Sequence, residues 1–395
     1  MAGKPFVVET LGGRQIPFLR GILVQSLVDA GLSFADAYAF AKRIRNLLDD
    51  VEDAVTTSEL RRLIGEELER RYDEQTRLNY DAGGAAQSIN VRHEGRVEPF
   101  SVGMLTSRLE GCGIRHEQAA RGAGLVQVSL RERGEDLVED RDLRRIIYET
   151  LKTSCCPRSA NRYLSRCHLN DSGAPLIVLI GGATGTGKST VATRLAYLLD
   201  IVRTQSTDMM REIIRCYLVP HVAPTLGFSS FEAWHGLPKV DGAGADSASE
   251  DPVVSGFLAQ FGAVRVALEA TIARAVKERH DLIVDGVHVL PTHLDLEEIA
   301  QKAVLVPLVL AVTTRAKLDD HFLRRSREQP DRDSDLHRNT VSGIWALQTF
   351  MVDQAQKAEI PVIVNWNLNE TVRQVMDVIM NRIGERFPPD PKTLE

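Results

Sequence analysis

The chain has 395 residues, of which 43% are hydrophobic and 26% charged, and its formal net charge is −6; this is the composition of a globular protein with two or three domains. The acidic balance and the low aromatic content disfavour a nucleic-acid partner, which would require a basic groove with stacking side chains. The N-terminus lacks the pattern of a signal peptide, and the longest apolar run, at 303–312, has the length of a buried strand, so we expect a cytoplasmic protein without a membrane partner.

One sequence unit of about 80 residues occurs twice in the first 170 residues. "GRQIPFLRGIL" (13–23) matches "GRVEPFSVGML" (95–105), and "ELRRLIGEEL" (59–68) matches "DLRRIIYETL" (142–151). Each copy opens with a hairpin-like segment and continues with apolar residues at helical spacing, which in the first copy are Leu23, Leu27, Ala37, Phe40, Ile44 and Leu47. The sequence therefore predicts two small, mainly helical domains, at 1–82 and 89–170, joined by a linker.

The two copies resemble the ATP-cone, a small regulatory nucleotide-binding domain. The resemblance rests on the Gly-Arg-x-x-x-Phe opening, the helix after it, and a closing helix with Tyr80 or Tyr163. The family usually opens with a basic Lys-Arg-Asp-Gly-type segment; the first copy has "TLGG" there, whereas the second retains Arg92 and His93. Nucleotide binding is what the resemblance implies, but we favour a packing module through which the chain forms a homo-oligomer.

Five cysteines stand at irregular positions, which favours free thiols over a disulfide framework. Cys155, Cys156 and the Cys167-His168 pair suggest a zinc site. Their spacing is not that of paired C-x₂-C ligands, and adjacent cysteines rarely bind one tetrahedral ion. We therefore expect thiols here rather than a metal centre.

A glycine-rich phosphate-binding loop begins the second half of the chain. The stretch "LIVLIGGATGTGKST" (176–190) is a strand-like run followed by the pattern G-x-x-x-x-G-K-S and a helix expected at 188–199. Its backbone N–H groups are expected to surround the phosphates of ATP, with Lys188 at the β- and γ-phosphates and Ser189 on Mg²⁺. The predicted nucleotide-binding residues are Gly182, Ala183, Thr184, Gly185, Thr186, Gly187, Lys188, Ser189 and Thr190.

Strand-like runs alternate with helical segments throughout 174–395. The strand candidates are 176–181, 282–284, 304–312 and 361–365. Such alternation predicts an α/β domain with a parallel sheet covered by helices on both faces. Because these strands and helices all lie within it, a fragment of residues 172–395 is expected to fold alone.

The segment "STDMMREIIRCYL" (206–218) predicts a helix with a chemically suggestive face. Asp208, Arg211 and Arg215 follow one another at i, i+3 and i+7, so they share a face. Asp208 is expected to orient or deprotonate an acceptor hydroxyl, and the two arginines to hold an anionic acceptor. An exposed helix with internal ion pairs explains the same pattern.

The segment "HDLIVDGVHVLP" (280–291) predicts a strand that ends at Asp285. A carboxylate there suits a second contact to Mg²⁺. His288, two residues beyond Gly286, is expected at the carboxyl edge of the sheet, where ligands bind in open α/β folds. A substrate contact and a purely structural histidine remain equal alternatives.

Arginine is concentrated in "HFLRRSREQPDRDSDLHRN" (321–339). A segment of this kind closes over transferred phosphates, and we expect Arg324 and Arg327 to serve the transition state. Interleaved acidic residues are also compatible with a solvated charged loop. The polar segment 239–252 is expected to be a flexible loop.

The order of these motifs resembles the 2-phosphoglycerate kinase family over about 174–380. "TDMMRE" and "VDGVH" are the most specific elements; the family usually has Glu-Gly-Val-His where this chain has Asp285. The resemblance implies a P-loop kinase that transfers the γ-phosphoryl group of ATP to 2-phosphoglycerate, giving 2,3-bisphosphoglycerate. The doubled ATP-cone-like repeat is a second departure from the family pattern.

Three classes of function remain open from the residues alone. The first is a kinase of a small anionic metabolite, either a phosphorylated hydroxy-acid or another polyanion such as an inositol phosphate. The second is a nucleoside or polynucleotide kinase, which the charge and aromatic content disfavour. The third is a nucleotide sensor without catalysis, which Asp208 and the arginine-rich segment disfavour.

Overall fold

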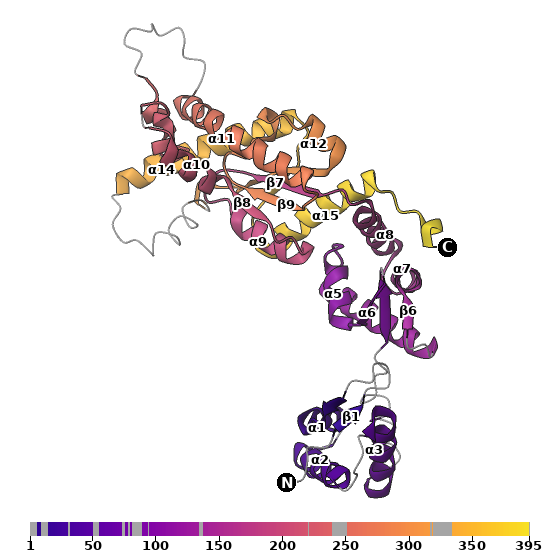
Figure 1. Ribbon diagram of the computed structural model, residues 1–395. Helices are drawn as coiled ribbons and strands as arrows, with labels where there is room; N and C mark the ends of the chain where they lie inside the picture. Colours follow the sequence, from indigo (N-terminus) through magenta and orange to yellow (C-terminus); the bar gives the residue numbers. More distant parts are fainter. Residues whose placement is uncertain are drawn as a thin grey trace. The chain divides into compact units, whose positions relative to one another are not determined.

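The structure is a computed structural model (Figure 1). It describes residues 6–8, 15–30, 32–49, 55–72, 76–77, 80, 89–93, 95–133, 137–219, 221–238, 251–316, 318 and 334–394. The chain divides into two compact units, one of residues 1–100 and 130–139 and the other of residues 101–129 and 140–395.

In the part of the chain that the structure describes, the first unit contains two three-stranded sheets together with helices. Its elements are β1 (Phe6–Val8), β2 (Gln15–Pro17), α1 (Arg20–Asp29), α2 (Phe34–Asp49), β3 (Val55–Thr56), α3 (Thr57–Arg71), β4 (Asn90–His93), β5 (Arg96–Pro99) and β6 (Leu137–Glu139). In each sheet the first strand is central, antiparallel to the second strand and parallel to the third. The predicted opening hairpins are confirmed, and both copies of the sequence unit have the same strand order.

Helical spacing correctly predicts most of the core of the first copy. Leu27, Ala37, Phe40 and Ile44 are buried together between α1, α2 and α3. Leu47, which the same spacing assigns to this face, is 36% exposed. The apolar stripe of α2 is thus narrower than the pattern suggests.

The second unit contains a five-stranded sheet with helices on both faces. Before the sheet come α5 (Val102–Glu110), most of α6 (His116–Arg133), α7 (Asp140–Ser154) and α8 (Pro157–Ser172). The remaining elements are β7 (Leu176–Gly181), α9 (Lys188–Leu199), β8 (Thr204–Ser206), α10 (Thr207–Tyr217), η1 (Pro224–Gly227), η2 (Ala233–Gly236), α11 (Pro252–Lys277), β9 (Leu282–Asp285), η4 (Pro291–His293), α12 (Glu297–Lys302), β10 (Val304–Ala311), α14 (Ser334–Lys357), β11 (Val362–Val364), α15 (Leu368–Arg386) and η5 (Pro391–Leu394).

The sheet is entirely parallel, with strand order β11-β10-β7-β9-β8. The four predicted strands are confirmed within two residues at each end. The three inner strands β7, β9 and β10 are apolar runs buried on both faces, whereas the edge strand β11 is only partly buried. The sequence did not reveal β8, whose residues Thr204, Gln205 and Ser206 are polar and largely exposed at the edge. From β7 the chain proceeds first to β8 and β9 on one side and later to β10 and β11 on the other, so β7 is the topological switch point.

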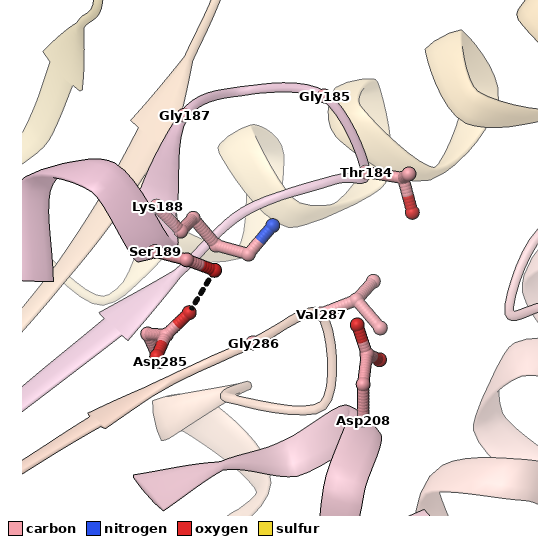
Figure 2. Close-up of a pocket in the computed structure, with 9 residues that line it drawn as sticks. All are labelled: Thr184, Gly185, Gly187, Lys188, Ser189, Asp208, Asp285, Gly286 and Val287. Carbon is pink, nitrogen blue, oxygen red and sulfur yellow. Dashed lines mark hydrogen bonds between the residues drawn. The ribbon is translucent and has the colours of Figure 1, made fainter. Parts of the chain in front are cut away.

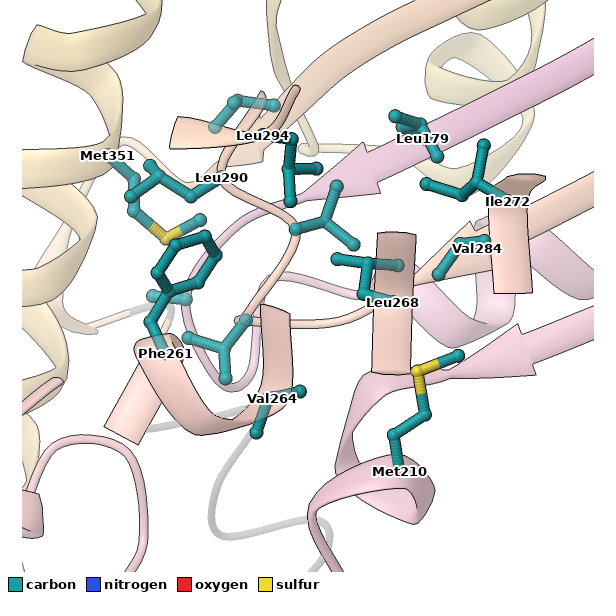
Figure 3. Packing of buried hydrophobic residues seen from close by; sticks show 14 of the residues in the cluster. Leu179, Met210, Phe261, Val264, Leu268, Ile272, Val284, Leu290, Leu294 and Met351 are labelled. Carbon is teal, nitrogen blue, oxygen red and sulfur yellow. The ribbon is translucent and has the colours of Figure 1, made fainter. Parts of the chain in front are cut away.

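Helices cover both faces of this sheet. On one face α9 and α15 contact each other and the strands, and on the other α11 contacts α10, α12 and α14 (Figure 1). Between the sheet and α11 lies a cluster of buried side chains, in which Leu179 and Val284 meet Phe261, Leu268 and Ile272 (Figure 3).

Among the described helices, α11 alone is long and apolar enough to cross a membrane by length and composition. Polar residues such as Gln260 and Arg265 interrupt its apolar sequence, so no continuous apolar run marks this helix in the sequence. Phe257, Phe261, Val264, Leu268 and Ile272 of this helix are buried in the core cluster. One apolar face of this helix thus packs in the core of the protein, while Val266 is exposed.

Helices that precede the sheet also pack on its covering layer. The Arg162 guanidinium of α8 donates to the Asp377 carboxylate of α15 at 2.6 Å, and a Cβ at Gly111 would lie 2.7 Å from the carbonyl oxygen of Leu198 in α9. The expectation of an independently folding fragment 172–395 did not include these contacts, because they join residues far apart in the sequence.

Candidate active site

The strand register gathers the phosphate-binding loop and two carboxylates at one edge of the sheet. Ile180 of β7 pairs with Asp285 of β9, which in turn pairs with Ser206 of β8. The residues that follow these three positions are the loop, Gly286 and the start of α10. Since the strands are parallel, all three segments leave the sheet at its carboxyl edge.

The loop has the conformation that a phosphate site requires. Gly187 has φ +86°, a left-handed conformation that suits glycine, and α9 begins at the next residue. The Lys188 ammonium donates to the carbonyl oxygen of Ala183 at 2.7 Å, and the Thr186 hydroxyl donates to the same oxygen at 2.9 Å. The loop is thus closed by its own side chains around the N-terminus of α9.

Asn365, which directly follows β11 and belongs to none of the predicted motifs, supports this loop. Its side-chain amide donates to the carbonyl oxygen of Thr186 at 2.9 Å, and its Oδ1 accepts from the Thr371 hydroxyl at 2.9 Å. A Cβ at Gly187 would overlap the Asn365 amide nitrogen. The position of Asn365 at the end of a predicted strand is the sequence signal that could have identified it.

A polar pocket opens between the loop, the end of β9 and the start of α10. Figure 2 shows the Lys188 ammonium directed into this pocket, while the Asp208 carboxylate is directed toward it from α10. The lining residues are Thr184, Gly185, Gly187, Lys188, Ser189, Asp208, Asp285, Gly286 and Val287. The predicted residues Gly182, Ala183, Thr186 and Thr190 belong to the same loop and helix but do not line the pocket.

Asp285 is held beside the start of α9. The Ser189 hydroxyl donates to its Oδ2 at 2.7 Å (Figure 2). Burial raises the pKa of Asp285, and nearby Asp208 acts in the same direction, while the Ser189 hydrogen bond and the Lys188 charge lower it. A cation in this pocket would be stabilised by both carboxylates.

The donor set fits a magnesium ion that reaches the protein together with a nucleotide. Ser189 and Asp285 present a hydroxyl and a carboxylate oxygen side by side, which are hard ligands of the kind Mg²⁺ prefers. Among the residues that the structure describes, no group of three or more His, Cys, Asp or Glu side chains could hold a metal by itself. Mg²⁺ typically uses one or two protein ligands and completes its shell with phosphate oxygens and water.

Arg211 and Arg215 do not line the pocket. The Arg211 guanidinium donates to the carbonyl oxygens of Leu226 and Phe228, at 2.8 and 3.0 Å, and also to Glu212. Arg215 is half exposed and pairs with the same glutamate. The structure therefore brings Asp208 to the pocket and uses Arg211 to hold the segment around η1.

His288 is fully buried, and all its polar atoms face protein groups. Its ring lies between Gln260 and Thr207, and burial lowers the pKa of His288 to about 3, assisted by the charges of Arg211 and Lys188. The predicted contact of His288 with a substrate gains no support from these surroundings.

Arg324, Arg327 and most of the segment 239–252 lie outside the described residues.

Several known proteins with the same described activity are similar to this chain over about three quarters of its length. The 2-phosphoglycerate kinase of Pyrococcus horikoshii is 34% identical over 287 residues, which is 73% of this chain and 91% of that protein. Those of Thermococcus kodakarensis and Pyrococcus furiosus are 33% and 31% identical over 73% and 75% of this chain, and each is covered over 94% of its length. No protein-family profile matches the chain.

Similar solved structures include a shikimate kinase from Bacteroides thetaiotaomicron, with 13% identity and a TM-score of 0.29 over 52% of this chain and 98% of that one. A dephospho-CoA kinase from Campylobacter jejuni has 14% identity and a TM-score of 0.26 over 54% of this chain and 98% of that one. Family membership rests on the sequence relatives, several of which exceed 30% identity over nearly their whole length. By this similarity the chain belongs to the 2-phosphoglycerate kinase family.

Proposed function

We propose that this chain transfers the γ-phosphoryl group of ATP to the hydroxyl group of 2-phosphoglycerate, giving 2,3-bisphosphoglycerate and ADP. The observation that carries this proposal is the pocket itself: a lysine of the phosphate-binding loop and the Asp208 carboxylate, brought there by different elements, face one space. Membership of the 2-phosphoglycerate kinase family supports the choice of acceptor.

In the proposed reaction the acceptor hydroxyl oxygen forms a bond to the γ-phosphorus as the bond from that phosphorus to the β,γ-bridging oxygen breaks. Asp208 orients the hydroxyl group and accepts its proton, and ADP leaves with the bridging oxygen. Lys188 supplies positive charge where negative charge accumulates on the phosphate oxygens. The protein thus contributes position and charge, which is what phosphoryl transfer requires.

Ser189 and Asp285 are the residues that would hold Mg²⁺. Bound there with the nucleotide, the ion would neutralise phosphate charge and orient the transferring group. The short hydrogen bond between the two side chains supports this assignment, since it already brings the hydroxyl and carboxylate oxygens within 2.7 Å.

Further cations are needed to recognise the phosphate and the carboxylate of the acceptor. Arg211 and Arg215 remain our proposal for that task, supported by their place on α10 after Asp208. Arg324 and Arg327 remain our proposal for contacts to the transferring phosphoryl group.

For the first 170 residues we propose two ATP-cone-like repeats through which the chain forms a homo-oligomer. The common strand order of the two copies supports the assignment as repeats. A cytoplasmic location also remains a proposal.

The proposed function is tested by following ADP release from Mg·ATP with a panel of acceptors. The purified chain is expected to use 2-phosphoglycerate and to leave 3-phosphoglycerate, glycerate and nucleosides nearly unreacted. ³¹P NMR of the product should show two phosphomonoester resonances on one glycerate. Faster consumption of an inositol phosphate or a nucleoside would overturn the acceptor while leaving the kinase assignment intact.

A further inference from the structure

A buried network of three polar side chains lies beneath the pocket. Thr207, Gln260 and His288 each have no exposed surface, and they come from α10, α11 and the segment after β9. Buried polar groups of this kind are retained only where their hydrogen bonds are satisfied. None of the three lines the pocket.

The contacts of Gln260 fix which way its amide points. Its Nε2 lies 2.6 Å from the carbonyl oxygen of Thr225 and 3.0 Å from that of Phe228, two groups that can only accept. The amide nitrogen must therefore face them, and Oε1 must face His288 Nε2 at 2.9 Å. Because Oε1 only accepts, His288 has to carry its proton on Nε2.

This arrangement in turn defines the contact between His288 and Thr207. With the proton on Nε2, the neutral ring leaves Nδ1 as an acceptor, and Nδ1 lies 3.3 Å from the Thr207 hydroxyl. The backbone N–H of His288 also donates to the Thr207 oxygen, at 3.4 Å. The direction of each of these hydrogen bonds, from Gln260 through His288 to Thr207, is thus set.

The network ties together the two backbone segments that carry the carboxylates of the site. Thr207 immediately precedes Asp208, and Gly286 immediately follows Asp285. Gly286 has φ +156°, and a Cβ there would overlap the Thr207 hydroxyl. The close approach of these segments therefore depends both on the glycine and on the side chain of Thr207.

We propose that Thr207, His288 and Gln260 are positioning residues for Asp208, an inference that rests on the proposed kinase function. His288 acts as a neutral Nε2-protonated imidazole between the Gln260 amide and the Thr207 hydroxyl. The chain of hydrogen bonds fixes the first turn of α10, so that the Asp208 carboxylate is directed at the phosphate-binding loop. A rigid support of this type matters because small displacements of a reacting group lower rates strongly.

The decisive comparison is Thr207→Val against Thr207→Ser. Valine keeps the shape but removes the hydroxyl, whereas serine keeps the hydroxyl and loses the methyl group. We expect Thr207→Val to lower kcat by about 10-fold to 100-fold, with the KM for ATP changed by less than about 3-fold. Thr207→Ser should restore most of kcat. Thr106→Val is the control, because Thr106 is a similarly buried hydroxyl whose bond to the Val102 carbonyl lies within α5.

A double-mutant comparison tests whether the residues act as one chain. Gln260→Met removes both polar atoms with little change in volume. If the network acts through Thr207, the variant Thr207→Val with Gln260→Met should lose little more kcat than the more impaired single variant. Losses that multiply, equal effects of valine and serine at Thr207, or wild-type kcat in Thr207→Val would each overturn the proposal.

A spectroscopic measurement separates this inference from the choice of acceptor. In full-length protein labelled with ¹⁵N-histidine, the His288 ring should show a protonated Nε2 and an unprotonated Nδ1, unchanged between about pH 5 and 8. Gln260→Met should alter that signature. If 2-phosphoglycerate proves not to be the acceptor, the kcat comparison is made with the acceptor that is used. A protonated Nδ1 in the wild-type chain overturns the network whatever the acceptor.

Discussion

Lys188 and Asp208 illustrate how single residues of unlike charge come to share one pocket. Lys188 opens α9 and is only 9% exposed, with its ammonium bound to the Ala183 carbonyl. Asp208 lies in the first turn of α10, whose N-cap Ser206 accepts from the Asp208 backbone N–H at 3.3 Å. The Lys188 ammonium is therefore held by the loop, whereas the Asp208 carboxylate is held by the first turn of α10. Each side chain can thus be substituted without removing the contacts that hold the other.

Lys188→Ala is expected to reduce kcat by about 10²-fold or more, because one contact to charge that develops in the transition state is worth roughly 3 kcal/mol. Steady-state ADP release with Mg·ATP and 2-phosphoglycerate measures the effect. Lys302→Ala is the matched control, since Lys302 is an exposed lysine paired with Glu298 on α12. Wild-type turnover in Lys188→Ala would show that the loop is not catalytic.

Asp208→Asn should separate binding from chemistry, because the amide keeps the size of the side chain and loses the basic oxygen. We expect kcat to fall by roughly 10²-fold or more, with ATP affinity nearly unchanged. Asp353→Asn, at an exposed position of α14, provides the control. An unchanged kcat would leave Asp208 with a structural role in the first turn of its helix.

At the scale of elements, the site depends on β7, β9 and β8, which end side by side, and on β11, which is followed by the residue that supports the loop. β11 is only three residues long, yet it delivers Asn365, whose backbone N–H bonds to the Ala311 carbonyl at 2.8 Å. The side chain of Asn365 then joins the loop to Thr371 in the first turn of α15. The end of a short edge strand and the first turn of α15 thus support the glycine-rich loop.

Asn365→Leu should weaken nucleotide binding, because it removes the donor that holds the Thr186 carbonyl. A typical net loss of about 1 kcal/mol corresponds to roughly a fivefold higher KM for ATP. Asn365→Asp distinguishes the two contacts, since it retains the acceptor for the Thr371 hydroxyl and lacks the donor to the loop. If aspartate preserves the wild-type KM, the donor to Thr186 is not what the loop requires.

At the scale of the whole molecule, helices that precede the sheet belong to the same compact unit as the sheet. Besides the pairing of Arg162 with Asp377, the ring of His168 in α8 lies 3.1 Å from the Pro388 carbonyl oxygen and 2.9 Å from the Thr393 hydroxyl. These contacts attach the C-terminal segment to α8. The kinase half therefore has packing partners outside residues 172–395.

A fragment of residues 172–395 is accordingly expected to be poorly soluble, or to melt at a clearly lower temperature than the full chain. Its loss of α5 and α8 would expose the faces of α9 and α15 that they cover. Thermal unfolding of both proteins by circular dichroism measures this. Arg162→Ala in the full chain should shift Tm in the same direction by a smaller amount. A fragment with the Tm of the full chain would contradict this dependence.

The pH dependence of stability should carry a contribution from His288. Its pKa falls from an ordinary value of 6.5 to about 3 on folding, so between these values the unfolded chain binds a proton that the folded chain does not. The free energy of unfolding therefore decreases as pH falls from about 6.5 toward 3, by up to about 1.4 kcal/mol per pH unit. Urea titrations of wild type and His288→Asn should show a shallower acid slope in the variant. Parallel slopes would show that His288 does not titrate in this way.

Sequence alone determined the features that local chemistry dictates. Gly187, Lys188 and Ser189 are typical of a phosphate-binding loop where a strand leads into a helix. Continuous apolar runs such as 176–181 and 304–312 favour buried strands of a parallel sheet, and both are strands. The repeated opening "GR" with Pro and Phe likewise predicted two hairpins, and both are present.

Only the tertiary structure decided which polar residues meet. Arg211 and His288 have sequence contexts that suit ligand binding. In the structure, however, the Arg211 guanidinium donates to two backbone carbonyl oxygens, and the His288 ring lies between Gln260 and Thr207. Asn365 has no motif and nevertheless holds the glycine-rich loop through the Thr186 carbonyl oxygen. Sequence spacing fixes the face of a helix or strand, but burial and hydrogen-bond partners arise from segments brought together by strand register and packing, which no local pattern encodes.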